Sequence, residues 1–387
     1  MQQGRARGRR WPWVVAGALL VALGIGAVAL WSAYQRLDSN IATIDPTDGL
    51  GDVRPAKENE ALNVLAIGSD TREGANSVVG GDSPGLADTT MVVHLSADNT
   101  WAAGVSIPRD SMVQMPDCVG PDGRIVPGAL RQFNAAYPIG GPVCVQRTVE
   151  SLTGLRIDHF VVIDFVGFVD MVEAVGGITV YIPEPISDPN SKIYFEAGCQ
   201  TLDGQAALDY VRVRKGVGGS NGSDTDRIER QQAFLSSLIQ KVTSSGVLFN
   251  PLELYDFLDA VTRSVTTDPG IGSIRSMASL AVRVRAIGLE SIEFTTVPFE
   301  VYPPDPNRVQ WAQPEADEMW ATLRADEPLT PKPSPTPSGS SGSDGSSSAT
   351  PSASGSPNAE EPPDSPSPSP SATLDTTTAD QPICPTT

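Results

Sequence analysis

An uncharged apolar stretch near the N-terminus constrains the fold of this chain more than any other feature. Residues 11–34 carry no charged side chain, are rich in Ala, Val, Leu and Gly, and follow four arginines within residues 5–10. A helix of this length rises about 36 Å, enough to cross a hydrocarbon core roughly 30 Å thick. We therefore predict a transmembrane helix over residues 11–34.

The flanks of this stretch predict its orientation. Trp11, Trp13, Trp31 and Tyr34 lie at its two ends, where interfacial aromatic residues concentrate. Basic residues 1–10 are expected to stay in the cytoplasm, so a single-pass protein would expose the rest of the chain outside the cell membrane. The alternative is a signal peptide cleaved near Ala27-Val28-Ala29, but the length of the run favours an uncleaved anchor.

Composition divides the rest of the 387-residue chain. Residues 326–387 are mostly Pro, Ser, Thr, Gly, Ala and acids, so they cannot bury enough surface to offset their ordering entropy, and we expect a disordered tail. Residues 35–60 are polar and punctuated by prolines, which predicts an extracellular stalk. Residues 61–325 remain, enough for one domain with a sizeable core.

Charge and cysteine content exclude several classes of protein. The formal net charge of −19 argues against a nucleic-acid partner. Two histidines and the absence of a C-x-x-C spacing make a zinc site improbable. Cys118 and Cys144 flank a loop rich in Gly and Pro, and we expect them to form a disulfide. Cys199 either stays a free thiol or pairs with Cys384.

Residue patterns in the domain alternate between short apolar runs and amphipathic segments. Such alternation predicts an α/β fold with a mixed β-sheet sandwiched between helices. The expected strands are 63–68, 90–95, 101–107, 159–163, 178–182, 210–214 and 292–298. The expected helices are 145–152, 165–175, 205–208, 228–242, 251–262 and 271–284.

Cations gather in one part of this acidic chain. On the expected strand, Arg212 and Arg214 would share a face because side chains alternate with a period of two. On the helix that follows, Arg227, Arg230 and Gln231 lie three or four residues apart and share another face. Converging guanidinium groups suit a phosphate or pyrophosphate. The alternative is a surface braced by ion pairs with neighbouring aspartates.

Acidic residues follow or flank three of the expected strands. Asp70, Asp88 and Asp110, the last beside Arg109, occupy loops where sheet proteins place reactive groups. Paired carboxylates suit a hard cation such as Mg²⁺, which also takes oxygen atoms from phosphate. The alternative is that these aspartates form turns or cap helices. The sequence contains no P-loop and no dinucleotide-binding fingerprint.

A series of motifs, taken in order, resembles the LytR-CpsA-Psr family. The match runs over about residues 62–245, and the basic N-tail, single span and external domain also fit the layout of that family. The motifs are Gly68-Ser69-Asp70-Thr71-Arg72, Ala87-Asp88-Thr89, Ser106-Ile107-Pro108-Arg109-Asp110, Phe133-Asn134-Ala135-Ala136-Tyr137 and residues 162–168, 202–208, 210–214 and 224–232.

This resemblance implies an α/β/α enzyme that moves a glycopolymer from a polyprenyl-pyrophosphate carrier to peptidoglycan, through a phosphodiester at N-acetylmuramic acid. It implies Mg²⁺ or Mn²⁺ as cofactor, with Asp70 and Asp88 as metal-linked carboxylates. Asp88 or Asp110 would serve as general base, and residues 160–175 and 234–239 would line a groove for the lipid. The alternative for the phenylalanines of these segments is that they belong to the core, which we expect for most of them. The pyrophosphate-binding positions would be Arg109, Arg212, Arg214, Arg227 and Gln231, with Asp224 nearby.

Two departures from the pattern of the family stand out. Leu86 occupies a position where many relatives carry an arginine, and the loop between Asp70 and Asp88 is long and rich in Gly. Two other functions stay open on the sequence alone. The chain would either bind lipid phosphate or the wall without turnover, as a regulator, or hydrolyse the carrier pyrophosphate with water as acceptor.

Overall fold

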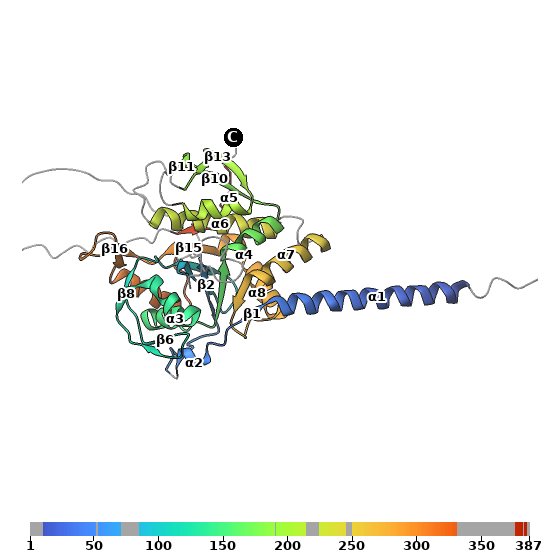
Figure 1. The fold of residues 1–387 in the computed structure, drawn as a ribbon, viewed down its shortest axis with the longest axis horizontal. Helices are drawn as coiled ribbons and strands as arrows, with labels where there is room; N and C mark the ends of the chain where they lie inside the picture. Colours follow the sequence, from blue (N-terminus) through green and yellow to red (C-terminus); the bar gives the residue numbers. More distant parts are fainter. Residues whose placement is uncertain are drawn as a thin grey trace, which may run out of the picture.

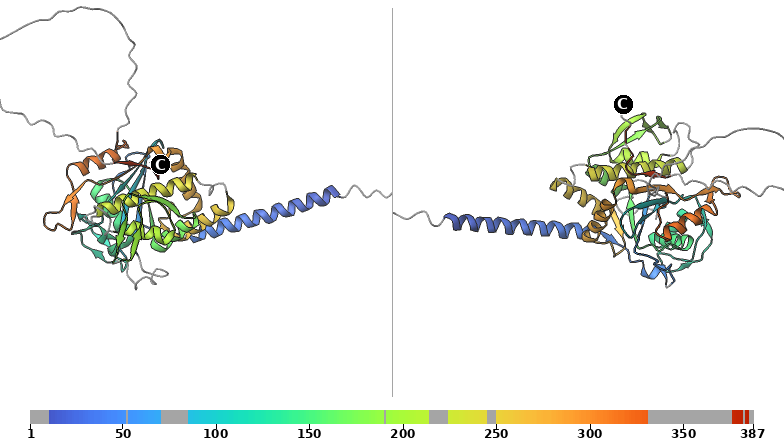
Figure 2. Two further views of the ribbon diagram at one scale, coloured as in Figure 1. Left: turned by 90° about the horizontal axis from the view of Figure 1, so that it is seen from above. Right: turned by 180° about the vertical axis from the view of Figure 1, so that it is seen from behind.

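The computed structural model describes residues 11–51, 53–70, 85–189, 191–213, 224–244, 250–330, 376–381 and 383–384. A long helix, α1 (Trp11–Asn40), extends away from a folded domain in every view (Figures 1 and 2). Within the described ranges, α1 is the one helix long and apolar enough to cross a membrane. The predicted N-terminal apolar helix is therefore present.

A mixed sheet forms the centre of the domain. In spatial order its strands are β1-β14-β9-β2-β3-β4-β15-β18, and β2, β4, β9 and β15 run parallel to one another. The bounds are β1 (Ala42–Thr43), β2 (Leu62–Ser69), β3 (Ala87–Leu95), β4 (Ala102–Ser106), β9 (His159–Asp164), β14 (Val265–Thr267), β15 (Ile292–Thr296) and β18 (Thr377–Thr378).

Helices cover both faces of this sheet, because the side chains of each central strand alternate between two cores. Leu65 and Ile67 of β2 point into a core closed by α3 (Ala136–Thr153) and α9 (Glu315–Arg324). On the other face, Met91 and Phe294 pack towards α6 (Asp224–Ser244) and α8 (Ile274–Ile287). The predicted α/β/α sandwich is confirmed.

A smaller unit with its own core stands beside α6 (Figure 1). Val172 of α4, Ile178 and Leu208 are among the residues buried in this core. Its elements are α4 (Phe165–Ala174), α5 (Gly204–Arg212), the antiparallel pair β10 (Ile178–Ile182) and β13 (Gly198–Leu202), and the pair β11 (Ile186–Asp188) and β12 (Ile193–Phe195). The helix α7 (Pro251–Ser264) packs against α4.

Short elements fill the connections between the larger ones. They include the helix α2 (Thr47–Leu50) and the 3-10 turns η2 (Phe133–Ala135) and η4 (Leu289–Ser291). The hairpin pairs are β5 (Met112–Gln114) with β8 (Leu130–Gln132), β6 (Cys118–Val119) with β7 (Ile125–Val126), and β16 (Phe299–Val301) with β17 (Val309–Trp311).

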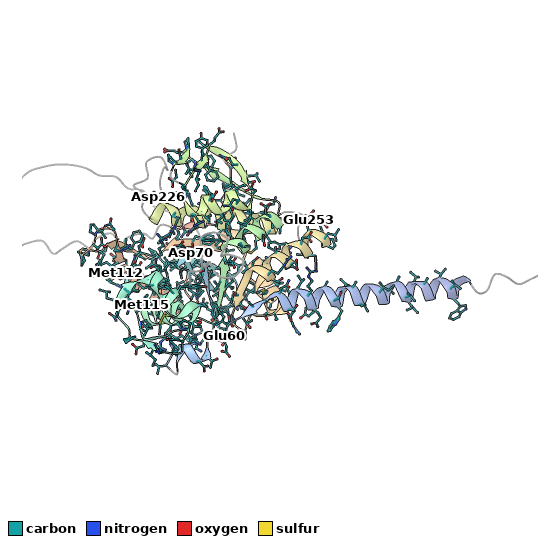
Figure 3. The ribbon with its side chains drawn as sticks, viewed as in Figure 1. Glu60, Asp70, Met112, Met115, Asp226 and Glu253 are labelled. Carbon is teal, nitrogen blue, oxygen red and sulfur yellow. A yellow bond between two sulfur atoms is a disulfide. The ribbon has the colours of Figure 1, made fainter. Side chains whose placement is uncertain are left out.

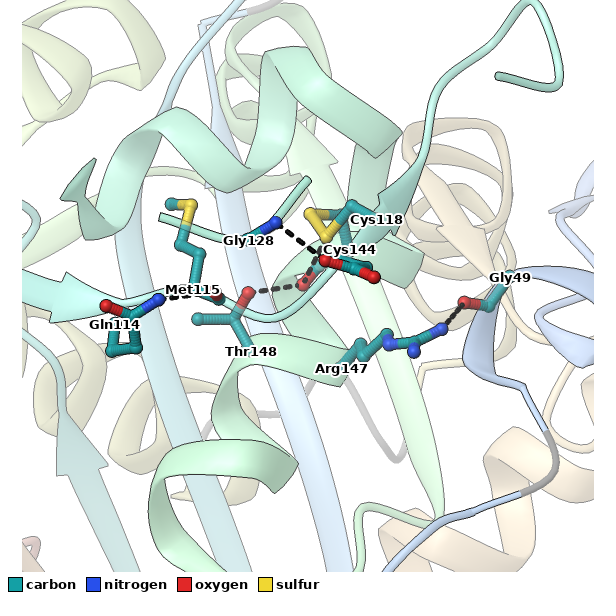
Figure 4. Close-up of a disulfide and its surroundings, with 9 residues drawn as sticks. Gly49, Gln114, Met115, Cys118, Gly128, Cys144, Arg147 and Thr148 are labelled. Carbon is teal, nitrogen blue, oxygen red and sulfur yellow. Dashed lines mark hydrogen bonds between the residues drawn. A yellow bond between two sulfur atoms is a disulfide. The ribbon is translucent and has the colours of Figure 1, made fainter. Parts of the chain in front are cut away.

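A disulfide joins Cys118 to Cys144 and ties β6 to α3, as predicted (Figure 4). Both half-cystines are buried, and the Cys144 carbonyl accepts a hydrogen bond of 2.7 Å from the Thr148 hydroxyl. The loop rich in Gly and Pro is therefore fixed to the helix that covers one face of the sheet.

The segment expected to be a stalk, residues 35–60, packs in part against the domain. Leu37, Ile41 and Leu50 are buried against the domain. Asn40 donates to the side chains of Asp259 and Thr262 of α7, at 3.1 and 3.2 Å. The strand β1 extends the central sheet by pairing with β14. A few apolar side chains in a polar segment are enough to anchor it.

The C-terminal segment also differs from the expected disordered tail, which falls mostly outside the described residues. Residues 377–378 pair with β15, Ala379 is fully buried, and Gln240 of α6 donates to the carbonyls of Ala379 and Gln381. Cys199 and Cys384 form a disulfide. Of the two alternatives that the sequence left open for Cys199, the structure has the pairing with Cys384.

Candidate active site

The candidate site forms where the parallel strands of the sheet end. Asp70 follows β2, while Arg109 and Asp110 follow β4, so all three residues lie at the carboxyl edge of the sheet. Antiparallel β3 begins at the same edge and carries Asp88. Ligands of open α/β sheets bind outside the carboxyl ends of the strands, so this edge is the expected place for chemistry.

A β-bulge sets the direction of Asp88. Ser69 pairs with Ala87 and Gly68 with Thr89, which leaves Asp88 as the extra residue. Such an insertion breaks the strict alternation of side chains along a strand. As a result, Asp88 and its neighbour Thr89 both line the same cavity.

Two arginines from different elements hold Asp88. Its carboxylate accepts a hydrogen bond from the Arg109 guanidinium, and both side chains are largely buried, with 20% and 10% of their surface exposed. The Arg227 guanidinium, from α6, donates to the Asp88 carbonyl oxygen at 3.0 Å. A charge-assisted bond shielded from water is stronger than one at the surface. The structure thus brings together three residues predicted from the sequence.

Asp110 lies beside this pair, but its carboxylate is engaged elsewhere. One oxygen accepts from Gln132 at 2.9 Å and from Arg308 at 3.2 Å, and the other is 3.7 Å from the Arg109 guanidinium. Asp110 does not line the cavity that Asp88 lines. Of the two predicted general bases, Asp88 has the better position, and Asp110 braces Arg109.

Asp70, which is labelled in Figure 3, closes the end of the β2–β3 ladder. Its backbone N–H donates to the Leu86 carbonyl at 3.2 Å, and its carboxylate accepts from the Leu86 N–H. Leu86 therefore contributes its backbone to the site. The long loop between Asp70 and Asp88 lies mostly outside the described residues.

The carboxylates of Asp70 and Asp88 fit a Mg²⁺ or Mn²⁺ ion held partly by substrate. Each uses one oxygen in the hydrogen bonds described above. The same ranges contain no group of three or more His, Cys, Asp or Glu side chains that would form an all-protein cage. Mg²⁺ commonly binds through one or two carboxylates together with phosphate oxygens, which this pair allows.

A cavity of about 790 Å³, the first cavity, extends from Asp88 between α4, α5 and α6. Its polar end carries Asp88, Thr89, Arg212, Arg227 and Gln231. Most of the rest of the wall is apolar and includes Ile163, Phe165, Phe168, Met171, Leu208, Val211, Phe234, Leu235 and Leu238, while Asp164, Asp188, Ser191 and Asp209 also line it. The predicted lipid-lining segments thus contribute to this wall, although Phe160 itself is fully buried in the core. The cavity suits a ligand with an anionic head and an apolar tail.

Contacts with neighbouring elements hold two of the predicted anion-binding residues, Arg212 and Gln231, at the first cavity. The Arg212 guanidinium lies 4.2 Å from the centre of the Phe165 ring, a cation–π contact. Gln231 donates from its amide to the Val211 carbonyl at 3.2 Å. Both contacts connect α5 to its neighbours and hold the polar end of the cavity in place.

The prediction of a strand over residues 210–214 is wrong. Residues 204–212 form the helix α5, which begins at Asp203, whose carboxylate accepts from the Ala206 N–H at 2.8 Å. Burial of Leu208 and Val211 outweighs the β-propensity of the local sequence. Arg212 therefore projects from the last turn of a helix. Arg214 lies outside the described residues, as does the side chain of Asp224.

The LytR-CpsA-Psr family model matches residues 28–325 of the chain. The chain belongs to this family. Among relatives, it is 34% identical over 317 residues to a probable cell wall biosynthesis protein, LcpB, of Corynebacterium glutamicum, covering 80% of this chain and 71% of that protein. It is 28% identical over 330 residues to the polyisoprenyl-teichoic acid–peptidoglycan teichoic acid transferase TagV of Bacillus subtilis, covering 82% and 78%.

Solved structures of other LytR-CpsA-Psr proteins share the fold. The crystal structure of B. subtilis TagV is 26% identical, with a TM-score of 0.52, covering 70% of this chain and 98% of that one. The LytR-Csp2A-Psr enzyme from Actinomyces oris is 20% identical, with a TM-score of 0.56, covering 73% and 95%. At that identity the likeness is one of fold alone.

Sequence reasoning missed several residues that shape the site. Arg308 reaches Asp110 from 198 positions away, and no local pattern marks it. Thr89 enters the cavity only because of the bulge. The helical spacing predicts that Arg230 shares the anion-binding face of Arg227 and Gln231, but its guanidinium donates to the Val213 carbonyl, and burial lowers its pKa. It supports the end of α5 instead of the cavity.

Proposed function

We propose that this member of the LytR-CpsA-Psr family is a transferase that moves a glycopolymer from a polyprenyl-pyrophosphate carrier to peptidoglycan, forming a phosphodiester at N-acetylmuramic acid. The observation that carries the proposal is the first cavity, because a largely apolar lining that also includes the two arginines Arg212 and Arg227 matches a lipid pyrophosphate. The transferase name of the related TagV supports the same reaction class.

In the proposed reaction, an acceptor hydroxyl forms a bond to the phosphorus next to the glycan, and the bond from that phosphorus to the bridging oxygen breaks. Lipid monophosphate leaves, and the hydroxyl proton passes to a carboxylate, for which Asp88 is the best placed. Arg109 and Arg227 sit beside that carboxylate and would stabilise charge that develops on the phosphoryl oxygens.

We further propose that Asp70 and Asp88 hold a Mg²⁺ or Mn²⁺ ion. When bound, such an ion would neutralise part of the pyrophosphate charge and polarise the phosphoryl group. The long apolar helix α1 supports a membrane anchor. We propose that the N-terminus is cytoplasmic and the domain extracellular, since four arginines precede the span.

The test uses the full-length protein in lipid nanodiscs with a short-chain polyprenyl-pyrophosphate glycan and peptidoglycan fragments, with and without Mg²⁺. Mass spectrometry should detect a glycan-phosphate-muramic acid adduct that is lost in Arg109→Ala. Glycan phosphate and lipid phosphate without the adduct would instead indicate hydrolysis. Tight donor binding without any turnover would indicate a lipid-phosphate binder and refute the transferase proposal.

A further inference from the structure

A second cavity of about 800 Å³ lies on the opposite side of α6 from the first. Arg227, Gln231 and Phe234 of this helix face the first cavity, whereas Gln232, Ala233 and Ser236 face the second. Successive residues of a helix point about 100° apart, so one helix separates two chambers. Each chamber falls within the roughly 300–1,000 Å³ typical of ligand sites.

The second cavity reaches the same edge of the sheet as the candidate reaction centre. Thr295, Thr296 and Val297 line it at the carboxyl end of β15, the strand next to β4. The Gln232 amide donates to the Ser106 hydroxyl at 3.0 Å and to the Thr295 carbonyl at 2.9 Å. Ser106 is the last residue of β4, and Arg109 follows three residues later. The hydrogen bond from Gln232 therefore joins the wall of the second cavity to the strand that leads to the site arginine.

The chemistry of the two cavities differs. No Lys, Arg or His is among the described residues that line the second cavity, and Glu229 and Glu315 contribute carboxylates. This lining disfavours a phosphate ligand. Aromatic rings, from Tyr181 and Phe299, combine with the amide of Gln381 and several hydroxyl groups. Apolar faces next to hydrogen-bonding groups match the two-sided character of a pyranose ring, which presents C–H faces and an edge of hydroxyls.

The wall formed by the C-terminal segment is held firmly. Thr377, Thr378 and Gln381 line the cavity. Pairing of β18 with β15, the hydrogen bonds from Gln240, and the disulfide from Cys384 to β13 fix this segment on three sides. A wall that is ordered in advance lowers the entropy cost of binding.

We propose that the second cavity is the acceptor subsite and binds an uncharged, N-acetylated stretch of a glycan strand. The inference rests on the proposed function, because a transferase must hold two substrates at one reaction centre. The lipid pyrophosphate would enter from the first cavity and the acceptor sugar from the second, with Asp88 and Arg109 at the edge of the sheet that both cavities share.

The test compares tryptophan substitutions at three helix positions in the full-length protein. Ala233→Trp fills the second cavity from an exposed position of α6, and Leu238→Trp fills the first cavity. The control Ala321→Trp places the same side chain at an exposed position of α9, away from both linings. Saturation-transfer NMR measures binding of a GlcNAc–MurNAc disaccharide, its lactyl carboxyl amidated so that the sugar is uncharged, without donor, and initial rates give the acceptor KM with donor present.

Ala233→Trp should abolish detectable disaccharide binding and raise the acceptor KM at least about tenfold, while donor affinity stays within about twofold. Leu238→Trp should weaken donor binding and leave disaccharide binding intact. In a second pair, Tyr181→Ala should weaken disaccharide binding about tenfold and Tyr181→Phe should restore it, because a ring face packs on the sugar.

Disaccharide binding and acceptor KM that are unchanged in Ala233→Trp would overturn the subsite while the transferase proposal stands. Absence of transfer in the wild type would refute the transferase proposal instead. Disaccharide binding is measured without donor, so loss of that binding in Ala233→Trp alone would still support a glycan site in the second cavity.

Discussion

The contact between Asp88 and Arg109 predicts that the two residues act as one unit in catalysis. Each substitution, Asp88→Asn or Arg109→Gln, removes one charge from a pair whose side chains are 20% and 10% exposed. Loss of one preorganised electrostatic contact to a transition state lowers kcat by about 10²–10³, or about 2.7–4 kcal/mol. We expect each single variant to lose activity in this range.

The double variant decides between a unit and two independent residues. Independent effects would multiply to about 10⁴–10⁶, whereas residues that act together lose little more in combination than alone. We expect the double variant to stay within about tenfold of Arg109→Gln. The assay is the initial rate of lipid phosphate release in nanodiscs, at saturating donor, for the four members of the cycle.

Stability measurements guard this interpretation. A hydrogen bond to a charged group contributes about 1.5–3 kcal/mol, and partial exposure of Asp88 places the loss at the lower end. Urea unfolding should therefore find all four proteins folded. If the loss of activity in the double variant, expressed as a free energy, equals the sum of the two single losses to within about 0.5 kcal/mol, the two residues act independently and the coupled unit is refuted.

Three further predictions concern other parts of the molecule. Arg212→Ala should weaken donor binding about tenfold, because it removes a cation from the polar end of the first cavity. The control Arg263→Ala, at an exposed position of α7, should bind donor as the wild type does. Equal donor affinity of Arg212→Ala and the wild type in titration calorimetry would contradict the prediction. Burial lowers the pKa of His94, so its stabilising contribution is present above about pH 6.5 and is lost as the pH falls towards the folded-state value. The urea midpoint should drop between pH 7.5 and 5, less so in His94→Gln; equal drops would argue against it. Cys199→Ser removes a cross-link to Cys384 across 185 residues and should lower the free energy of unfolding by about 2–4 kcal/mol; an unchanged urea midpoint would argue against this.

The central layers of this fold were predictable from the sequence because the spacing of their apolar residues marks strands and helices. The run at 63–68 and its neighbour at 90–95 became β2 and β3, each longer by a few residues. Their side chains are buried on both faces, which gives the continuous apolar runs that mark a central strand. Helix α6 was also expected, since its apolar residues recur with helical spacing.

Tertiary context decided the segments that were predicted wrongly. The residues Tyr210-Val211-Arg212-Val213 favour a strand locally, yet Asp203 caps the start of helix α5. Burial of its apolar side chains in the core of the smaller unit stabilises the helix up to Arg212. The C-terminal segment looks disordered by composition, and only Cys384 signalled an attachment. Within the site, Asp88 and Arg109 were identified from motif and charge, but Arg308 and the bulge at Asp88 depend on distant contacts.

The packed base of α1 gives the chain a built-in ruler. The helix continues to Asn40, which bonds to α7, and Asp38 accepts from the backbone of Ile274 in α8, so its end is clamped from two sides. One inserted residue above this clamp would lift the domain by about 1.5 Å and turn it by about 100° about the helix axis. The number of residues between Tyr34 and Asn40 would therefore determine the direction in which the first cavity faces relative to a membrane.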